Sequence, residues 1–129
     1  MRLLPVAIAA LIAVSSVSSP STAKAEDLLA ASICDYVKSN DKNRLRKKLK
    51  ENRVKLRNIY SGLSCDGESL LRTAYHSNAE DTGEFIAKRL SKTELEVVEA
   101  DGKTIVDWAD ANGFGASIIT LAIQDRLGS

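Results

Sequence analysis

The chain has 129 residues, 44% of them hydrophobic and 27% charged, and its 18 Lys and Arg nearly balance its 17 Asp and Glu. This length suits one domain with one core. No stretch approaches the roughly 20 consecutive apolar residues that a membrane span requires, which argues against a membrane-spanning helix in the folded protein.

The N-terminus has the pattern of a secretory signal peptide. Arg2 precedes an apolar run over residues 3–14, and the stretch Ala23-Lys24-Ala25 places small residues where a signal peptidase reads them. We predict cleavage after Ala25, which leaves residues 26–129 as a single domain that is periplasmic or secreted and has no transmembrane anchor. The alternative is an uncleaved N-terminal anchor.

Two helices are predicted in the first part of the mature chain. Apolar residues over 27–38 follow the i, i+3, i+4 spacing of a buried helical stripe. The stretch Ser39-Asn40-Asp41 then provides a stop and a new N-cap. A second helix follows over 42–51, and Asn52 can take the left-handed conformation that ends it.

A third helix is predicted over 54–63 and completes a first unit over 26–63. A competing interpretation is one long helix with a partner helix, because apolar residues and one polar residue follow a coiled-coil seam. The seam residues are Leu45, Leu49, Asn52, Leu56, Ile59 and Leu63. Since they cover under three heptads, we favour two helices with a break near Asn52.

Two stretches 35 residues apart, 65–74 and 100–109, share an Asp-Gly turn, a hydroxyl residue, aliphatics and an Ala. They open two similar units over 66–99 and 101–127. In the first, Gly67 turns the chain, Ser69 caps a helix over 70–77, Asn78 breaks it, and a second helix runs over 81–90.

The second unit repeats this order: Gly102 turns the chain and Thr104 caps a helix over 105–111. A tight connection over 112–115 then leads to a last helix over 116–127. Between the two units, a short helix is predicted to start after Thr93, with a strand over 91–99 as the alternative.

In these features the two units resemble ankyrin repeats. The matching residues are Gly102, Thr104, Ala109, Asn112-Gly113 and the run 118–121, with a weaker copy in Gly67, Ser69, Ala74, Asn78 and the run 85–90. Neither unit has the Pro-Leu-His sequence that follows the Thr in ankyrin repeats. The two units are 35 residues apart, whereas ankyrin repeats recur about every 33 residues. The predicted fold is all-α, an ankyrin-like, helical-repeat-like bundle of about six to seven short helices whose stacked faces share one core.

The signal peptide is followed by Cys34, the stretch 49–53, Ile59-Tyr60 and Cys65-Asp66-Gly67. In this order of features the chain resembles a family of small exported bacterial proteins of unknown function. The resemblance implies a periplasmic, disulfide-bonded protein and brings no known activity.

Cys34 and Cys65 are the only two cysteines. An even count in an oxidising compartment favours a disulfide over two free thiols. A redox-active pair usually has a closer spacing such as C-x-x-C, so we predict a structural disulfide.

The strongest candidate binding site is a basic stretch over 42–57. After cleavage the mature chain has a net charge of about −1, and this stretch alone carries a charge of about +8. Its nine cations are Lys42, Arg44, Arg46, Lys47, Lys48, Lys50, Arg53, Lys55 and Arg57. Such a face can bind an anionic surface.

Nucleic acid is not expected as a partner, because no aromatic residue is interleaved in this stretch for base stacking. The simplest alternative is a solvated face that pairs with acids of the chain itself or of a second copy. The acids considered for this role are Glu94, Glu96, Glu99, Asp101, Asp107 and Asp110. They lack the order of a Ca²⁺ loop, so no metal site is predicted.

Other reactive or aromatic side chains have structural interpretations. His76 is the only histidine, and the chain has no G-x-S-x-G motif that would support a hydrolase. We therefore expect His76 at the exposed end of a short helix. We expect Trp108 and Phe114 to anchor the core.

The sequence thus predicts an exported, non-enzymatic module without a cofactor, which binds another protein. The alternative is an envelope-associated protein that binds anionic polymers or lipid head groups through the basic stretch.

Overall fold

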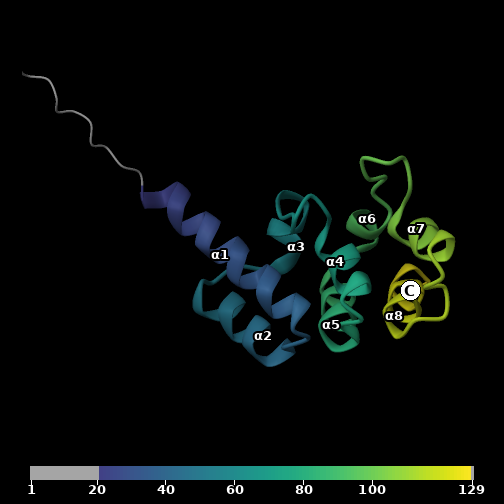
Figure 1. Ribbon diagram of the computed structural model, residues 1–129, viewed down its shortest axis with the longest axis horizontal. Coiled ribbons are helices and arrows are strands. Elements are labelled where there is room, and N and C mark those ends of the chain that lie inside the picture. Colours follow the sequence, from purple (N-terminus) through teal and green to yellow (C-terminus); the bar gives the residue numbers. More distant parts are fainter. Residues whose placement is uncertain (1–20, 129) are drawn as a thin grey trace, which may run out of the picture.

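A computed structural model of the protein describes residues 21–128 (Figure 1). These residues form α-helices and one 3-10 turn and contain no strand, so the predicted all-α fold is confirmed. The elements are α1 (Ser21–Lys38), α2 (Lys42–Glu51), α3 (Leu56–Ile59), η2 (Tyr60–Gly62), α4 (Leu70–His76), α5 (Glu80–Arg89), α6 (Lys92–Leu95), α7 (Ile105–Ala111) and α8 (Ile118–Leu127). Most of the predicted signal peptide lies outside the described residues.

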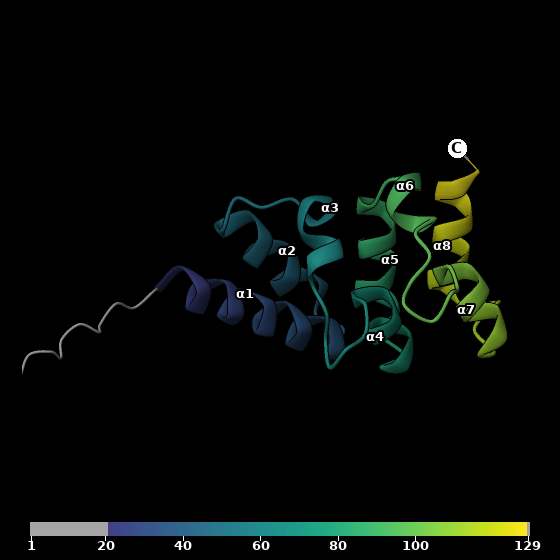
Figure 2. The same ribbon diagram turned by 90° about the horizontal axis from the view of Figure 1, so that it is seen from above.

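The longer helices lie in pairs along the longest axis of the molecule. Figure 2 shows α1 and α2, then α4 and α5, then α7 and α8, with the short α3 and α6 beside the pairs. Buried aliphatic residues from all three pairs form one continuous core. Ile33, Leu45, Leu71, Ile86 and Ile123 are among its members and are almost fully buried.

The first helix of each pair ends in the same way. The residue two positions after the helix has a positive φ: 58° at Asn40, 52° at Asn78 and 85° at Gly113. At each corner the next amide donates back five residues, as from Ala79 to the carbonyl of Ala74 at 2.9 Å. This is a Schellman motif, in which Asn and Gly tolerate the left-handed conformation best.

The N-caps of the predicted units are also confirmed. Ser69 Oγ accepts from the amide of Arg72, and Thr104 Oγ1 accepts from the amide of Asp107. The turns before these caps differ, however. Asp66 and Gly67 both have positive φ in a two-residue turn, whereas the later turn has a positive φ at Gly102 and closes between residues 99 and 103.

Three local predictions need correction. The left-handed residue after α2 is Arg53, with φ 54°, and Asn52 precedes it in a near-helical conformation. This break excludes the single long helix with a coiled-coil seam. The predicted helix over 54–63 is reduced to α3 and η2. α6 starts at Lys92 rather than after Thr93, because Ser91 forms a capping box with Glu94.

α5 takes its N-terminal cap from another helix pair. Its own N-cap residue, Ala79, has no side-chain acceptor. Asn40, in the corner after α1, accepts a hydrogen bond from the Thr82 amide at 3.0 Å through its Oδ1. The buried Thr82 hydroxyl also donates to the Val37 carbonyl at 3.1 Å. The first two helix pairs are therefore joined by hydrogen bonds as well as by apolar packing.

Gly83 lies within α5 and faces Ile119 of α8. A Cβ at this position would clash with Ile119 Cδ1 and would lie 3.3 Å from Ala74 Cβ. Ala normally stabilises a helix interior by up to about 1 kcal/mol relative to Gly. Here we expect Gly83→Ala to destabilise the fold by about 1 to 3 kcal/mol, because Ile119 is buried and cannot move without disturbing the core.

Urea denaturation followed by circular dichroism measures this effect. Adding Ile119→Val to Gly83→Ala should recover part of the loss, since it removes the contacting Cδ1 methyl. A stabilising Gly83→Ala would show that α5 and α8 are not packed this closely.

Candidate functional site: a cationic groove

A groove of about 440 Å³ lies between α2, α3, α5 and the end of α8. Its apolar lining consists of Leu49, Val54, Leu56 and Phe85. Around these residues stand seven cationic side chains. They are Arg46, Lys50, Lys55 and Arg57 from the predicted basic stretch and Lys88, Arg89 and Arg126 from later helices.

The local sequence explains why α2 presents cations to this groove. Asp41 caps the helix, with its carboxylate accepting from the Arg44 amide at 3.1 Å. Leu45 and Leu49 are one turn apart and bury one side of α2 in the core. The basic residues between them must then point away from the core, and all nine cations of the stretch are exposed or half-exposed.

The nine predicted cations do not form one face. Four of them line the groove, while Arg44, Lys47 and Lys48 line a separate depression beside Tyr36 and Glu51. Lys42 and Arg53 line neither. The predicted basic face is therefore divided into a groove side and an α1 side.

Most of these cations have no carboxylate partner within the described part of the chain. Among the nine, the ion pair found is between Arg44 and Asp41 at 3.4 Å. At the groove, Lys88 pairs with Glu84 at 3.3 Å and Arg89 lies over the Phe85 ring at 4.5 Å. The groove thus gathers cationic side chains around an apolar floor that is largely buried.

Two of the acids considered as partners of the basic stretch, Glu99 and Asp101, pair with Arg72 instead. Arg72, in α4, forms a bidentate pair with Asp101 at 2.8 and 2.9 Å. Its Nε lies 3.2 Å from Glu99 Oε1 without hydrogen-bond geometry. Its guanidinium also lies 4.9 Å from the Trp108 ring centroid. Two of the six acids considered are therefore paired with a cation outside the basic stretch.

This network shifts the pKa values of both acids. The hydrogen bonds from Arg72 lower the pKa of Asp101 to about 2. Burial raises the pKa of Glu99, and the positive charge of Arg72 offsets part of that effect. The Arg72 side chain is 11% exposed, so the network lies at the edge of the core.

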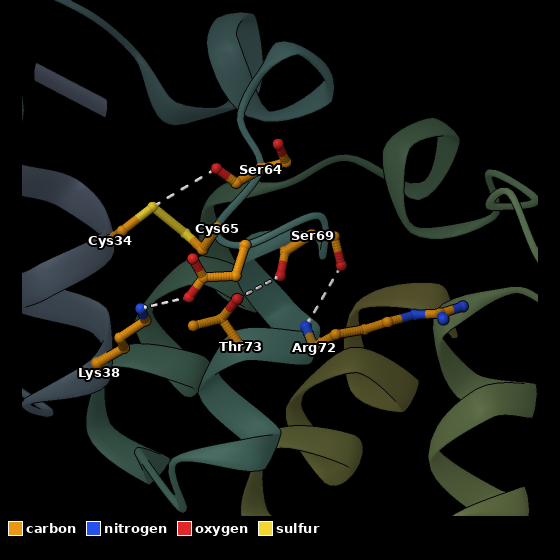
Figure 3. The surroundings of a disulfide bond; sticks show 8 residues. Cys34, Lys38, Ser64, Cys65, Ser69, Arg72 and Thr73 are labelled. Atoms are coloured by element: carbon orange, nitrogen blue, oxygen red, sulfur yellow. Dashed lines mark hydrogen bonds and ion pairs between the residues drawn. A yellow bond between two sulfur atoms is a disulfide. The ribbon is translucent and has the colours of Figure 1, made fainter. Parts of the chain in front are cut away.

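The predicted disulfide is confirmed and joins α1 to the turn before α4. Cys34 and Cys65 have Cα atoms 5.7 Å apart, and both residues are buried. Lys38, on α1, donates to the Asp66 carboxylate at 2.9 Å. Figure 3 shows Lys38 on the same side of the site as Cys34. The same view shows Ser69, whose hydroxyl caps α4 by accepting from the Arg72 amide.

His76 lies at the end of α4, with 51% of its side chain exposed, as predicted. Its Nε2 is 3.0 Å from a Glu68 carboxylate oxygen, and its ring meets the edge of Trp108. Trp108 is buried, as expected, against Tyr75 and Phe114. Phe114 is half-buried.

Sequence reasoning missed three groove cations, Lys88, Arg89 and Arg126. A run of basic residues marks α2, but these three are separated in sequence and reach the groove only through the packing of α5 and α8. A weak signal was available, since Lys88 and Arg89 fall in the last turn of α5 beside Phe85.

The fold and the groove define a class: a small all-α protein with one disulfide and a cationic groove. The model of the family described as "Protein of unknown function (DUF3718)" matches residues 33–97, about half of the chain, and the chain belongs to this family. The match runs from α1 through α6 and includes the disulfide and most of the groove. Comparisons with curated proteins and with solved structures find no match.

Two further searches cover residues 21–128 only. None of the helices there is long and apolar enough to cross a membrane. The same residues contain no group of three or more His, Cys, Asp or Glu side chains arranged to hold a metal ion.

Proposed function

We propose that this protein is an exported, non-enzymatic binding module of the bacterial envelope, and that it binds an acidic segment of another protein in the cationic groove. The observation that carries the proposal is the combination of seven cations with an apolar lining in one groove. The buried disulfide supports an oxidising compartment.

The groove suits a peptide segment better than a charged polymer. Its volume of about 440 Å³ falls in the range of ligand sites that hold a few side chains. A polyanion needs only positive charge, whereas the half-buried Val54 adds apolar surface, above the buried Leu49 and Phe85, that an aliphatic side chain can cover. An acidic segment with one such side chain satisfies both features.

The arrangement of helices supports a binding role as well. We propose that the units over 66–99 and 101–127 are degenerate, ankyrin-like repeats, because α4 and α7 begin at matching caps and end in the same corner. Stacked helix pairs build extended surfaces that bind partners. In this protein the groove lies on such a surface.

A charge reversal in the groove tests the proposal. We expect Lys50→Glu with Lys55→Glu to weaken partner binding at least about tenfold, since both side chains line the groove and would repel an acidic segment. The matched control is Lys42→Glu with Lys47→Glu, which makes the same change of charge outside the groove. The measurement is capture of proteins from the native envelope fraction by the mature, oxidised chain.

The result expected is one stoichiometric protein that wild type and the control retain and the groove variant loses. Equal loss in both variants would contradict a specific site and indicate attraction by net charge alone. Heparin and vesicles containing phosphatidylglycerol form two further arms. Groove-dependent, salt-sensitive binding to these probes without a protein partner would instead support the envelope polymer or lipid alternative.

A further inference from the structure

A second groove, of about 330 Å³, has the disulfide in its wall. Cys34 and Cys65 both line this disulfide groove, and they are 8% and 4% exposed. Figure 3 shows the disulfide between α1 and the segment that carries the exposed Ser64, which also lines the groove. Thiolates react with a disulfide by direct attack on one of its sulfur atoms. The disulfide groove thus gives a small thiol a path to both cysteines.

The spacing of residues on α1 explains why this path is open. Asp27, Ala30, Ala31, Cys34 and Lys38 all line the groove and follow each other at helical intervals, so they share one face of α1. The two alanines have short side chains and lie one turn before Cys34. Longer side chains at these positions would cover the sulfur atom from the α1 side.

The disulfide groove is negatively charged. Three carboxylates, from Asp27, Asp35 and Asp66, line it together with one ammonium group, from Lys38, which gives a net charge of −2. Lys38 pairs with Asp66 at 2.9 Å. Asp27 and Asp35 are exposed and form no ion pair within the part of the chain that the structure describes. A groove lined by uncompensated acids concentrates cations and repels anions.

We propose that the disulfide is a thiol–disulfide exchange site that selects thiols carrying a positive charge. The attacking thiolate sulfur bonds to one cysteine sulfur, and the Cys34–Cys65 bond breaks. Its electron pair leaves on the other cysteine sulfur, which takes a proton from water. A second thiolate then attacks the mixed disulfide, so the thiol is oxidised to its own disulfide and the protein keeps two reduced cysteines. Reduction frees the turn before α4 from α1.

Reduction of the mature, oxidised protein by a cationic thiol, cysteamine, and by an anionic one, mercaptopropionate, tests the proposal. Mass spectrometry after alkylation of free thiols gives the two rate constants at low ionic strength. We expect Asp27→Asn with Asp35→Asn to lower the ratio of the cysteamine rate constant to the mercaptopropionate rate constant at least about threefold. The intrinsic reactivities of the two thiols cancel, because the same thiols are used with each protein.

The matched control is Glu96→Gln with Asp125→Asn, which removes two exposed acids outside the disulfide groove and should keep the wild-type ratio. Added salt should lower the wild-type ratio towards that of the groove variant, which tests the selection without any substitution.

Equal ratios in all three proteins would overturn the proposal, and so would an equal fall in the control, which would indicate the net charge of the chain alone. Rates that do not depend on thiol concentration would also overturn it, because reduction would then require prior unfolding. None of these substitutions touches the cationic groove, so the proposed function is tested separately.

Discussion

Replacing Cys34 and Cys65 by Ala is expected to lower the free energy of unfolding by about 3 to 4 kcal/mol. The two residues are 31 positions apart, so the disulfide removes the entropy of a long loop from the unfolded chain. For a domain of about 100 residues, this loss corresponds to a fall in melting temperature of about 15 to 25 °C. Thermal unfolding followed by circular dichroism measures it.

Reduction of the wild-type protein should lower the free energy of unfolding by a similar amount. Both cysteines are buried, so the two thiols keep the packing around them and only the crosslink is lost. Adding reductant to the double variant should then change nothing. A loss below about 1 kcal/mol in either experiment would show that α1 and the turn before α4 are held by packing alone.

Replacing Arg72 by Met is expected to cost about 2 to 3 kcal/mol at neutral pH. Glu99 would keep a half-buried carboxylate without its cation, and Asp101 would lose a bidentate partner. The loss should stay below the roughly 3 to 5 kcal/mol of a fully buried pair, because 41% of the Asp101 side chain is exposed to solvent. Urea denaturation measures the difference.

The cost of Arg72→Met should depend on pH in a defined direction. In the folded wild type the pKa of Asp101 lies at about 2, below its ordinary value of 3.8. A carboxylate with a lowered pKa stabilises the fold at pH values above its ordinary pKa, and this contribution is lost as the pH falls towards 2. The difference between wild type and variant should therefore be large at pH 7. It should shrink first as Glu99, whose raised pKa rises further without Arg72, becomes protonated above its ordinary value of 4.5, and then between about pH 4 and pH 2 as Asp101 becomes protonated.

Lys38→Met provides a matched control for the Arg72 variant. It also removes a cation from an aspartate, Asp66, at 2.9 Å, but both side chains of that pair are largely exposed. Exposed pairs contribute little to stability, so the control should be close to wild type at neutral pH. An equally large loss in both variants would contradict a special role for the Arg72 network.

Local rules predicted the parts of the fold that local chemistry determines. α2, α4 and α7 start where predicted, because the side chains of Asp41, Ser69 and Thr104 each accept a hydrogen bond from the backbone amide three residues later. α2 and α7 also end where predicted, and α4 ends one residue early. The residue that ends α2 differs from the one predicted. Arg53 takes the left-handed position because the buried Leu49 fixes the last turn of α2 and its carbonyl accepts from the Val54 amide, although no residue preference favours Arg there.

Features that depend on distant contacts could not be predicted. The sequence marks the basic stretch but not the groove, since Arg126 is far from α2 in the chain. The sequence shows the acidic residues but does not indicate which cation pairs with them, because Arg72 is a single cation in a short helix. The pairing of Arg72 with Asp101 across 29 positions follows from the packing of α4 beside the later turn.

The cap that Asn40 provides for α5 has a consequence for how the molecule opens. The amide proton of Thr82 is bonded to a side chain 42 residues earlier rather than within its own helix turn. Solvent deuterium can reach this proton when the first helix pair separates from the second, even if α5 itself stays helical. The exchange rate at Thr82 therefore measures the cooperativity between neighbouring pairs, which tells a single folding unit from a chain of semi-independent ones.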